Sequence, residues 1–288
     1  MPVSYVLLHL FLTVALIFTA KRLPPKRALQ TVFYTAVLTI VGASIVIERR
    51  QTLAWSALAW GWQDLVFVSN LTIEGVAVLC VLLIKSADDR AGRLRAGFLS
   101  VIACSVALWS YAWYFMPSPS GINGRVDDKG FCRQTSKESC SAAAAVMLLH
   151  ANGIESTEAE MADLCLTRAG IGTSPFGLFR GLALKSRSHQ MNPMASNVHN
   201  ISGLGRLGRP AIISVGLSSG CPAEIEERMM GYGWEPGRYH AVTVMAADLQ
   251  GQWLDVSDPS YGKERWPAKD IEYIWDGRAL YLVRDKQK

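Results

Sequence analysis

The chain has 288 residues, of which 50% are hydrophobic, and carries 29 Lys and Arg against 24 Asp and Glu. Its mean hydropathy of +0.18 is high for an ordinary soluble protein and indicates apolar helices. The excess of positive charge lies in residues 1–116, and no basic stripe with interleaved aromatic residues occurs. This pattern disfavours a nucleic-acid partner.

The first 116 residues predict an all-α transmembrane region of about four helices. The predicted spans are residues 3–20, 28–47, 65–84 and 96–116, and only the third contains a charge within it, at Glu74. Each run is long enough, at about 1.5 Å per residue, to cross a hydrocarbon core of roughly 30 Å. A shorter tryptophan-rich stretch, residues 52–63, is predicted to lie at the membrane interface. We therefore expect membrane lipid as a partner, and the role of Glu74 stays open.

The distribution of basic residues predicts an orientation for these helices. Lysines and arginines concentrate in residues 21–27 and 85–95, and short basic loops remain on the cytoplasmic side of a membrane. The expected localisation is the bacterial inner membrane, with several spans and with everything after Met116 on the periplasmic side.

Residues 117–124 are rich in turn formers and predict a linker to a domain covering residues 125–288. Helix signals come first in this domain, and strand signals follow. The predicted helices are residues 141–151, 157–166 and 173–185, and the predicted strands are residues 211–217, 240–247, 252–256 and 279–283. Helices followed by strands indicate an α+β domain with an antiparallel sheet.

Four residues of this domain have the chemistry that a cysteine peptidase needs. Cys140 stands at a predicted helix start, where the helix dipole favours a thiolate. If the loop 249–250 closes a hairpin, residue 240 pairs with residue 259, so Asp258 comes within reach of His240. We therefore predict Cys140 as nucleophile, His240 as base and Asp258 as the group that orients it. The amide of Gln134 would donate to the oxyanion together with the Cys140 backbone N–H.

Each of these residues alone would more often be structural, and it is their combination that favours catalysis. His150 is excluded as the base, because ten residues along one helix separate it from Cys140 by about 15 Å. The spacing of Cys132, Cys140, Cys165 and Cys221 fits no common zinc knuckle, so neither a metal nor a cofactor is expected. A disulfide between two of Cys132, Cys165 and Cys221 stays open for an oxidising compartment.

The chain resembles the bacteriocin-processing, double-glycine-leader cysteine peptidases, which are papain-like. Four segments carry the resemblance: Gln134 with Cys140, residues 172–178, residues 240–244 and residues 258–262. The resemblance implies a papain-like domain, cleavage of leader peptides after a Gly–Gly pair during export, and the catalytic set Gln134, Cys140, His240 and Asp258. The chain departs from the family where Ser139 and Ser141 flank the cysteine in place of Asp and Gly.

These observations predict a membrane-anchored cysteine endopeptidase that processes exported polypeptides, with a separate export system as a further partner, since the chain has no Walker motif. Two alternatives stay open. One is a catalytically degenerate module that binds a leader or substrate and assists a transporter. The other is a cysteine-dependent acyltransferase, because a fold does not settle the outcome of a reaction.

Overall fold

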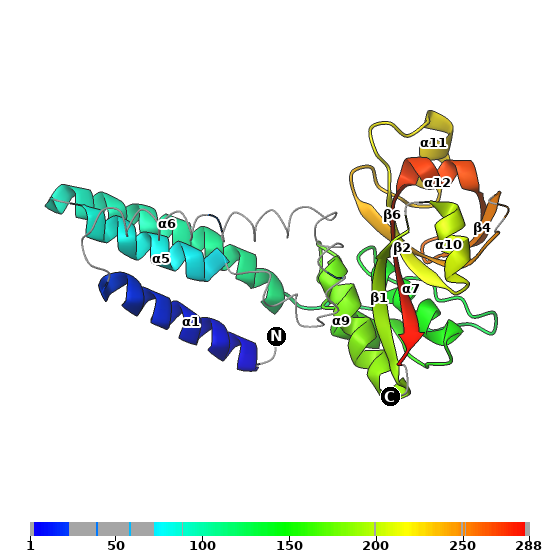
Figure 1. The fold of residues 1–288 in the computed structure, drawn as a ribbon. Helices are drawn as coiled ribbons and strands as arrows, with labels where there is room; N and C mark the ends of the chain where they lie inside the picture. The colour runs from blue at the N-terminus through cyan, green and yellow to red at the C-terminus, as the bar shows by residue number, and fades with distance from the viewer. Residues whose placement is uncertain are drawn as a thin grey trace. The chain divides into compact units, whose positions relative to one another are not determined.

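The computed structural model describes residues 3–22, 39, 58, 72–87, 89–198, 200–248, 250 and 252–285. The chain divides into two compact units, which we describe separately (Figure 1). One unit comprises residues 1–54 and 64–116, and the other comprises residues 55–63 and 117–288.

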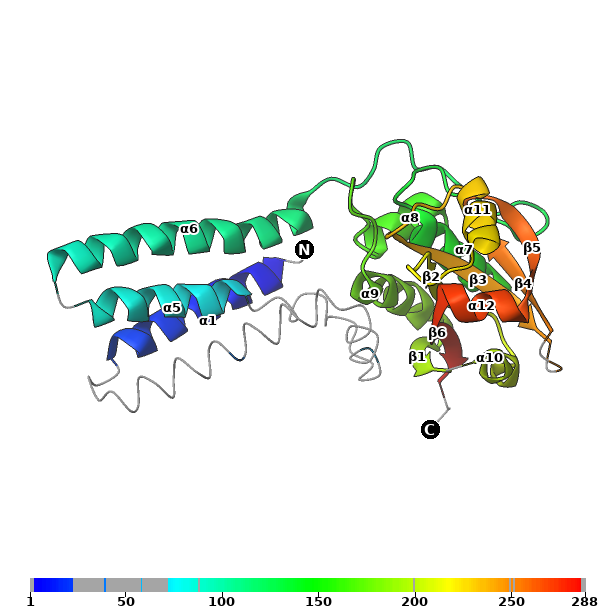
Figure 2. The same cartoon turned by 90° about the horizontal axis from the view of Figure 1, so that it is seen from above.

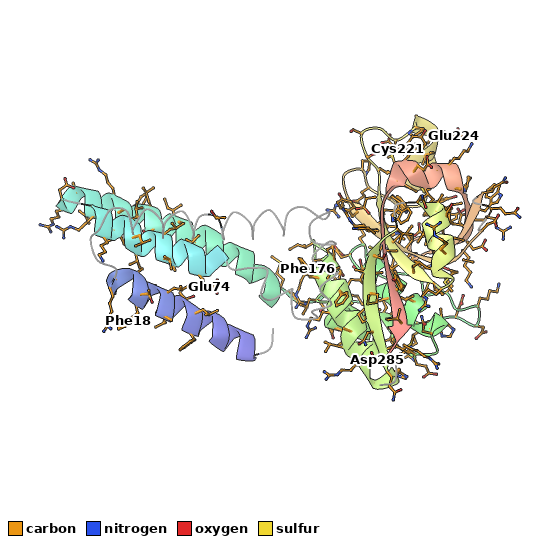
Figure 3. All side chains as sticks on the ribbon, viewed as in Figure 1. Phe18, Glu74, Phe176, Cys221, Glu224 and Asp285 are labelled. Carbon is orange, nitrogen blue, oxygen red and sulfur yellow. The ribbon has the colours of Figure 1, made fainter. Side chains whose placement is uncertain are left out.

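The first unit is helical where the structure describes it. It contains α1 (Val3–Arg22), α5 (Thr72–Ser86) and α6 (Arg90–Phe115). Helix α5 packs against both α1 and α6, as two views show (Figures 1 and 2), and a small buried cluster of Ala20, Val78 and Leu82 joins α1 to α5. Glu74, on α5, is 3% exposed (Figure 3).

The predicted transmembrane region is wrong, and so is the localisation that followed from it, because no helix in the described part of the chain is sufficiently long and apolar to cross a membrane. Helix α5 has 15 residues, about 22 Å at 1.5 Å per residue, against a core of roughly 30 Å. Helix α6 carries three arginines in its first two turns, and α1 ends in two basic residues. The predicted span 28–47 and the interfacial stretch 52–63 lie, except for Thr39 and Leu58, outside the described residues.

The second unit is built on a sheet of six strands in its described residues, with the order β1-β6-β2-β3-β4-β5. All neighbouring strands are antiparallel. The strands are β1 (Met191–Asn197), β2 (Ala211–Gly216), β3 (Tyr239–Ala247), β4 (Trp253–Asp258), β5 (Gly262–Pro267) and β6 (Trp275–Arg284). Strand β6 follows the other five in sequence but lies between β1 and β2.

Helices cover this sheet, and in the described residues three of them precede the first strand in sequence while three lie between strands. They are α7 (Cys140–Ala151), α8 (Glu158–Leu164), α9 (Pro175–Ser186), α10 (Ile201–Leu207), α11 (Ala223–Gly231) and α12 (Ala268–Ile274), with a 3₁₀ turn at Arg187–His189. Helix α7 packs against β2 and β3 and is flanked by α8 and α9. Helices α11 and α12 lie side by side (Figures 1 and 2) and are joined by an Arg228–Asp270 ion pair of 2.6 Å. The prediction of an α+β unit with an antiparallel sheet is confirmed.

Helix α7 is the central helix of this unit, and residues 141–149 are all buried. A helix that is apolar on all sides needs neighbours all around it. Four consecutive alanines, residues 142–145, allow the strands to approach closely, and the buried Thr243 hydroxyl of β3 donates to the Ala144 carbonyl at 3.0 Å. The start of α7 is therefore held in a fixed position against β3.

The starts of the next two helices follow the sequence signals. The Thr157 hydroxyl accepts a hydrogen bond from the Glu160 N–H at 3.2 Å, and the Ser174 hydroxyl accepts one from the Gly177 N–H at 3.1 Å. Both side chains thereby satisfy an N–H group that has no partner within its helix. Pro175 occupies the first turn of α9, where its missing N–H costs nothing.

The six cysteines of the chain are all free thiols, so the disulfide left open by the sequence is not formed in this structure. Among the described residues, no cluster of three or more His, Cys, Asp or Glu side chains could hold a metal ion.

Candidate active site

Cys140 is the first residue of α7, and the preceding N-cap residue leaves the helix start uncapped. Ser139 makes no side-chain hydrogen bond to the helix. Its hydroxyl donates instead to the Ser136 carbonyl at 2.8 Å. The N–H groups of the first helical turn have no partner within the helix. They therefore remain available to stabilise negative charge on the half-buried Cys140 thiol or on a bound substrate.

His240 lies near the start of β3, opposite Val215 of β2. Its Nε2 is 2.7 Å from Asp258 Oδ1, and its ring is close enough to the Cys140 thiol for the two groups to shift each other's pKa. An ionised carboxylate can only accept, so Nε2–H is the donor to Asp258. That assignment leaves Nδ1 to exchange a proton with Cys140. The structure therefore brings three of the predicted site residues together.

The strand register that brings His240 and Asp258 together differs by one residue from the predicted register. Thr243 pairs with Ser257, whereas the predicted hairpin would place residue 256 opposite residue 243. Side chains alternate between the two faces of a strand, so a shift of one residue changes the face. In the observed register Asp258 lies on the same face as His240, and the predicted register would have placed it on the other face. The longer connection 248–252 and a bulge between Val244 and Ala246 account for the difference.

Asp258 is fully buried and accepts hydrogen bonds on both oxygens. Its Oδ1 accepts from His240, from the Ser260 backbone N–H at 2.8 Å and from the Ser260 hydroxyl at 2.7 Å. Its Oδ2 accepts from the indole N–H of Trp234 at 2.9 Å. Burial by itself raises the pKa of this carboxyl, but the hydrogen bonds and the charge of His240 outweigh burial and lower the pKa.

The thiol and the imidazole shift each other's pKa in opposite directions. Burial acts to raise the pKa of Cys140, yet the hydrogen bond and the charge of His240 lower it below the ordinary value of a thiol. Burial also acts against the imidazolium, but hydrogen bonds to Asp258 and Cys140 raise the pKa of His240 to about 10. Both shifts favour a thiolate–imidazolium pair, which is the reactive form of a catalytic cysteine.

Gln134, the fourth predicted residue, lies in the loop that leads to Cys140. Its Nε2 donates to the Ser136 carbonyl at 3.0 Å. The same carbonyl accepts from the Ser139 hydroxyl, so the amide and the helix start are tied to one atom. The other hydrogen of the Gln134 amide remains for a substrate oxygen.

The turn that follows Asp258 is held by the residues around Gln134. The Gln134 backbone N–H donates to the Pro259 carbonyl at 2.9 Å. The Arg133 guanidinium donates to the carbonyls of Ser260 at 3.0 Å and Tyr261 at 2.8 Å. These three bonds fix the segment that carries Gln134 relative to the segment that carries Asp258.

Three residues that contact the site were missed by the sequence analysis: Arg133, Trp234 and Ser260. Ser260 lies inside the segment 258–262 already singled out, where a serine two residues after an aspartate is a common turn partner. Arg133 adjoins Gln134, but nothing in the sequence shows that it reaches a turn more than 120 residues away. Trp234 has no motif or spacing that marks it.

Comparisons with known proteins find distant structural similarity only. No family model and no curated protein sequence matches the chain. The peptidase domain of ComA from Streptococcus, a bifunctional ABC transporter involved in a quorum-sensing pathway, is 17% identical. That match covers 53% of this chain and 96% of that domain, with a TM-score of 0.40. A double-glycine-motif protease from an AMS/PCAT transporter, solved with its leader peptide, is 14% identical over 56% of this chain and 97% of that one, with a TM-score of 0.37.

A third similar structure is the N-terminal peptidase C39-like domain of a toxin secretion ATP-binding protein from Vibrio parahaemolyticus. It is 13% identical, and the match covers 52% of this chain and all of that domain, 100%, with a TM-score of 0.33. All three are described as proteases or peptidase domains from transport or secretion proteins. Because the similarity is distant, a function for this chain depends on the geometry of Cys140, His240 and Asp258.

Proposed function

We propose that this chain is a cysteine endopeptidase that cleaves a polypeptide substrate. The observation that carries the proposal is the position of the Cys140 thiol beside the His240 ring, whose Nε2 is hydrogen-bonded to the buried carboxylate of Asp258. A thiol at an uncapped helix start, an imidazole that can take its proton and a carboxylate that orients the imidazole together make an activated nucleophile.

The proposed reaction has two halves, formation of a thioester on Cys140 and its hydrolysis, and His240 transfers a proton in each. The Cys140 thiolate attacks the scissile carbonyl carbon, and the oxyanion is stabilised by the Cys140 backbone N–H and by Gln134. His240 then gives its proton to the leaving amine as the C–N bond breaks, which leaves a thioester on Cys140. In the second half, His240 takes a proton from water, hydroxide attacks the thioester, and the thiolate–imidazolium pair is restored as the acid product leaves.

The substrate class proposed first is a leader peptide that ends in a Gly–Gly pair. The support for this class is the sequence resemblance carried by residues 134–140, 172–178, 240–244 and 258–262. A related expectation is that the substrate reaches the site as an extended chain, because endopeptidases act on accessible backbone. Export of the product by a separate transport system is part of the same proposal.

The test is cleavage of a synthetic peptide with an internal Gly–Gly pair by the purified full chain, followed by mass spectrometry. We expect Cys140→Ala and His240→Ala each to abolish cleavage while the thermal unfolding temperature shows that both variants fold. Cys221→Ala is the matched control, because it also removes a half-buried free thiol and should cleave at the wild-type rate. Retained cleavage by Cys140→Ala would overturn the proposal.

Two other results would assign the site differently. If the wild-type Cys140 reacts with iodoacetamide no faster than an unactivated thiol, the site is a binding module and not a peptidase. If added glycinamide captures the acyl group in preference to water, the mass of the product identifies acyl transfer in place of hydrolysis.

A further inference from the structure

Trp234 contacts two members of the proposed catalytic set at once. It lies in the connection between α11 and β3, six residues before His240, and is 5% exposed. Its indole N–H donates to Asp258 Oδ2 at 2.9 Å. Its ring lies 5.1 Å from the His240 ring, tilted by 48°. One side chain therefore holds the carboxylate and covers the imidazole that the carboxylate orients.

The two carboxylate oxygens of Asp258 have different hydrogen-bond partners, and Trp234 is a partner of Oδ2. Oδ1 is shared between His240 and both donors of Ser260. In the described part of the chain, the hydrogen bond at Oδ2 comes from Trp234. Donors on one oxygen alone would leave the carboxylate free to turn about its Cβ–Cγ bond. A donor fixed at Oδ2 sets the plane of the carboxylate and thereby the direction in which Oδ1 faces His240.

A second indole holds Trp234 in place. Trp266 of β5 packs edge-on against Trp234, with ring centroids 5.7 Å apart and planes at 66°. Trp266 is 1% exposed, and its indole nitrogen has no hydrogen-bond partner among the described residues. The two buried indoles are therefore neighbours that differ in one respect, since only Trp234 donates to the catalytic carboxylate.

We propose that Trp234 is a positioning residue for this site: its indole N–H fixes the Asp258 carboxylate in the orientation that receives His240, and its ring excludes water from the His240–Asp258 contact. The proposal rests on the peptidase function proposed above. A hydrogen bond between charged groups is stronger when water is kept away from it. Loss of the indole N–H should therefore weaken the activation of Cys140 without removing any group that touches the substrate.

The first experiment compares Trp234→Phe with Trp266→Phe in the full-length chain. The rate of alkylation of Cys140 by iodoacetamide at pH 7 is followed by mass spectrometry of the peptide that contains Cys140. We expect Trp234→Phe to slow alkylation roughly tenfold, in line with the loss of one hydrogen bond to a charged group. Cleavage should fall by a similar factor in kcat with little change in KM, because the substrate contacts remain. Trp266→Phe should stay within about twofold of wild type in both measurements.

The results separate the inference from the function on which it rests. Fast alkylation of wild-type Cys140 together with equally fast alkylation in Trp234→Phe would overturn the role of Trp234 and leave the peptidase standing. Slow alkylation of the wild-type thiol would overturn the proposed function itself. Equal losses in the two Phe variants would mean that packing of the aromatic pair matters and that the indole N–H does not.

A second measurement applies even if Trp234→Phe does not fold. The chain has nine tryptophans, so ¹⁵N labelling gives a small set of indole N–H resonances. Asp258→Asn replaces a charged acceptor by a neutral one, and we expect it to shift one solvent-protected indole resonance strongly while the others move little. If no protected indole resonance responds, Asp258 does not accept from Trp234 in solution and the proposal is wrong.

Discussion

At the scale of single residues, the Ser136 carbonyl organises the region where an oxyanion would form. It accepts from Gln134 Nε2 at 3.0 Å, from the Ser139 hydroxyl at 2.8 Å and from the Ser139 backbone N–H at 3.3 Å. The first bond directs the glutamine amide, and the second keeps the serine from capping α7. The Ser136 carbonyl oxygen is thus hydrogen-bonded both to the Gln134 side chain and to Ser139, the residue before Cys140.

Gln134→Ala should separate the oxyanion step from the activation of the thiol. We expect kcat for peptide cleavage to fall by about 10²- to 10³-fold, the usual loss for one oxyanion donor. Alkylation of Cys140 by iodoacetamide should be unchanged, because that reaction forms no oxyanion. Exposed Gln250, in the connection between β3 and β4, gives the matched control Gln250→Ala. A parallel loss of alkylation in Gln134→Ala would contradict the assigned role.

The residues of the site differ in how well the sequence could predict them. Cys140, His240 and Asp258 could be proposed from the sequence because a nucleophile, a base and a group that orients the base, at a helix start and two strand ends, form a chemical pattern. Trp234 escaped because its role depends on the direction of one N–H bond, which a sequence does not show.

At the scale of helices and strands, α9 can approach the end of α8 because a glycine lies at the contact. A Cβ added to Gly181 would lie 2.9 Å from the Cys165 backbone nitrogen and would overlap the Cys165 sulfur. Cys165 is fully buried, and its backbone N–H donates to the Met161 carbonyl at 2.8 Å. Neither group can move aside without breaking this bond or disturbing the packing around it.

Gly181→Ala should therefore destabilise the protein even though alanine favours helices. We expect a loss of about 1–3 kcal/mol in the free energy of unfolding, typical of overpacking, measured by urea denaturation. Gly231 is the matched control, since it also lies in a helix and has open space where a Cβ would go. Gly231→Ala should stabilise the protein by roughly 0.5–1 kcal/mol. If the free energy of unfolding changes in the same direction in both variants, close packing at Gly181 does not explain the effect of Gly181→Ala.

The sequence predicted the central elements of the second unit better than its edges. The three helices α7 to α9 and the strands β2, β3, β4 and β6 were found within a few residues of their observed ends, because buried elements have clear apolar patterns. Strands β1 and β5 were missed. They are the two edge strands. Strand β1 contains Pro193, and β5 contains three consecutive charged residues, which sheet edges tolerate and interiors do not.

The transmembrane prediction failed for a related reason. It counted uncharged residues, whereas the length of a span is set by where a helix begins and ends. Helix α6 begins at Arg90, six residues before the apolar run that the sequence singled out, and its first two turns carry three arginines. Uninterrupted apolar runs do not contain this information.

At the scale of the whole molecule, the thiolate–imidazolium pair makes a contribution to the pH dependence of stability that can be worked out from its protons. Ordinary values, which describe the unfolded chain, are 9.0 for the thiol and 6.5 for the imidazole, whereas in the folded chain the pKa of Cys140 is lowered and that of His240 is raised to about 10. Between pH 6.5 and pH 9.0, these two groups together carry one proton in the unfolded chain, and it is on the Cys140 sulfur. Once Cys140 is a thiolate, the folded pair also carries one proton, on nitrogen. Equal proton numbers mean that the pair contributes no slope to the stability.

Cys140→Ala should remove this balance. His240 would still bind its proton in the folded state through Asp258, while in the unfolded chain it loses that proton above about pH 6.5. The folded state then holds more protons, so stability must fall as pH rises. We expect the free energy of unfolding of the variant, relative to wild type, to decrease by up to about 1.4 kcal/mol per pH unit just above pH 6.5. The decrease should end below pH 10, because loss of Cys140 removes two of the interactions that raise the pKa of His240. Urea denaturation at several pH values measures it, and parallel curves for the two proteins would contradict the proton accounting.

The position of β6 has a consequence for the order in which the molecule is made. Every residue of the proposed catalytic set precedes Trp275, yet β6, which begins there, completes the middle of the sheet between β1 and β2. A chain whose translation stops before residue 275 would contain the full set of reactive groups and leave β1 and β2 with unpaired edges. Unpaired edges favour aggregation, so a chain truncated before residue 275 would tend to aggregate. Under the proposed function, the topology thereby links a working site to completed synthesis of the chain.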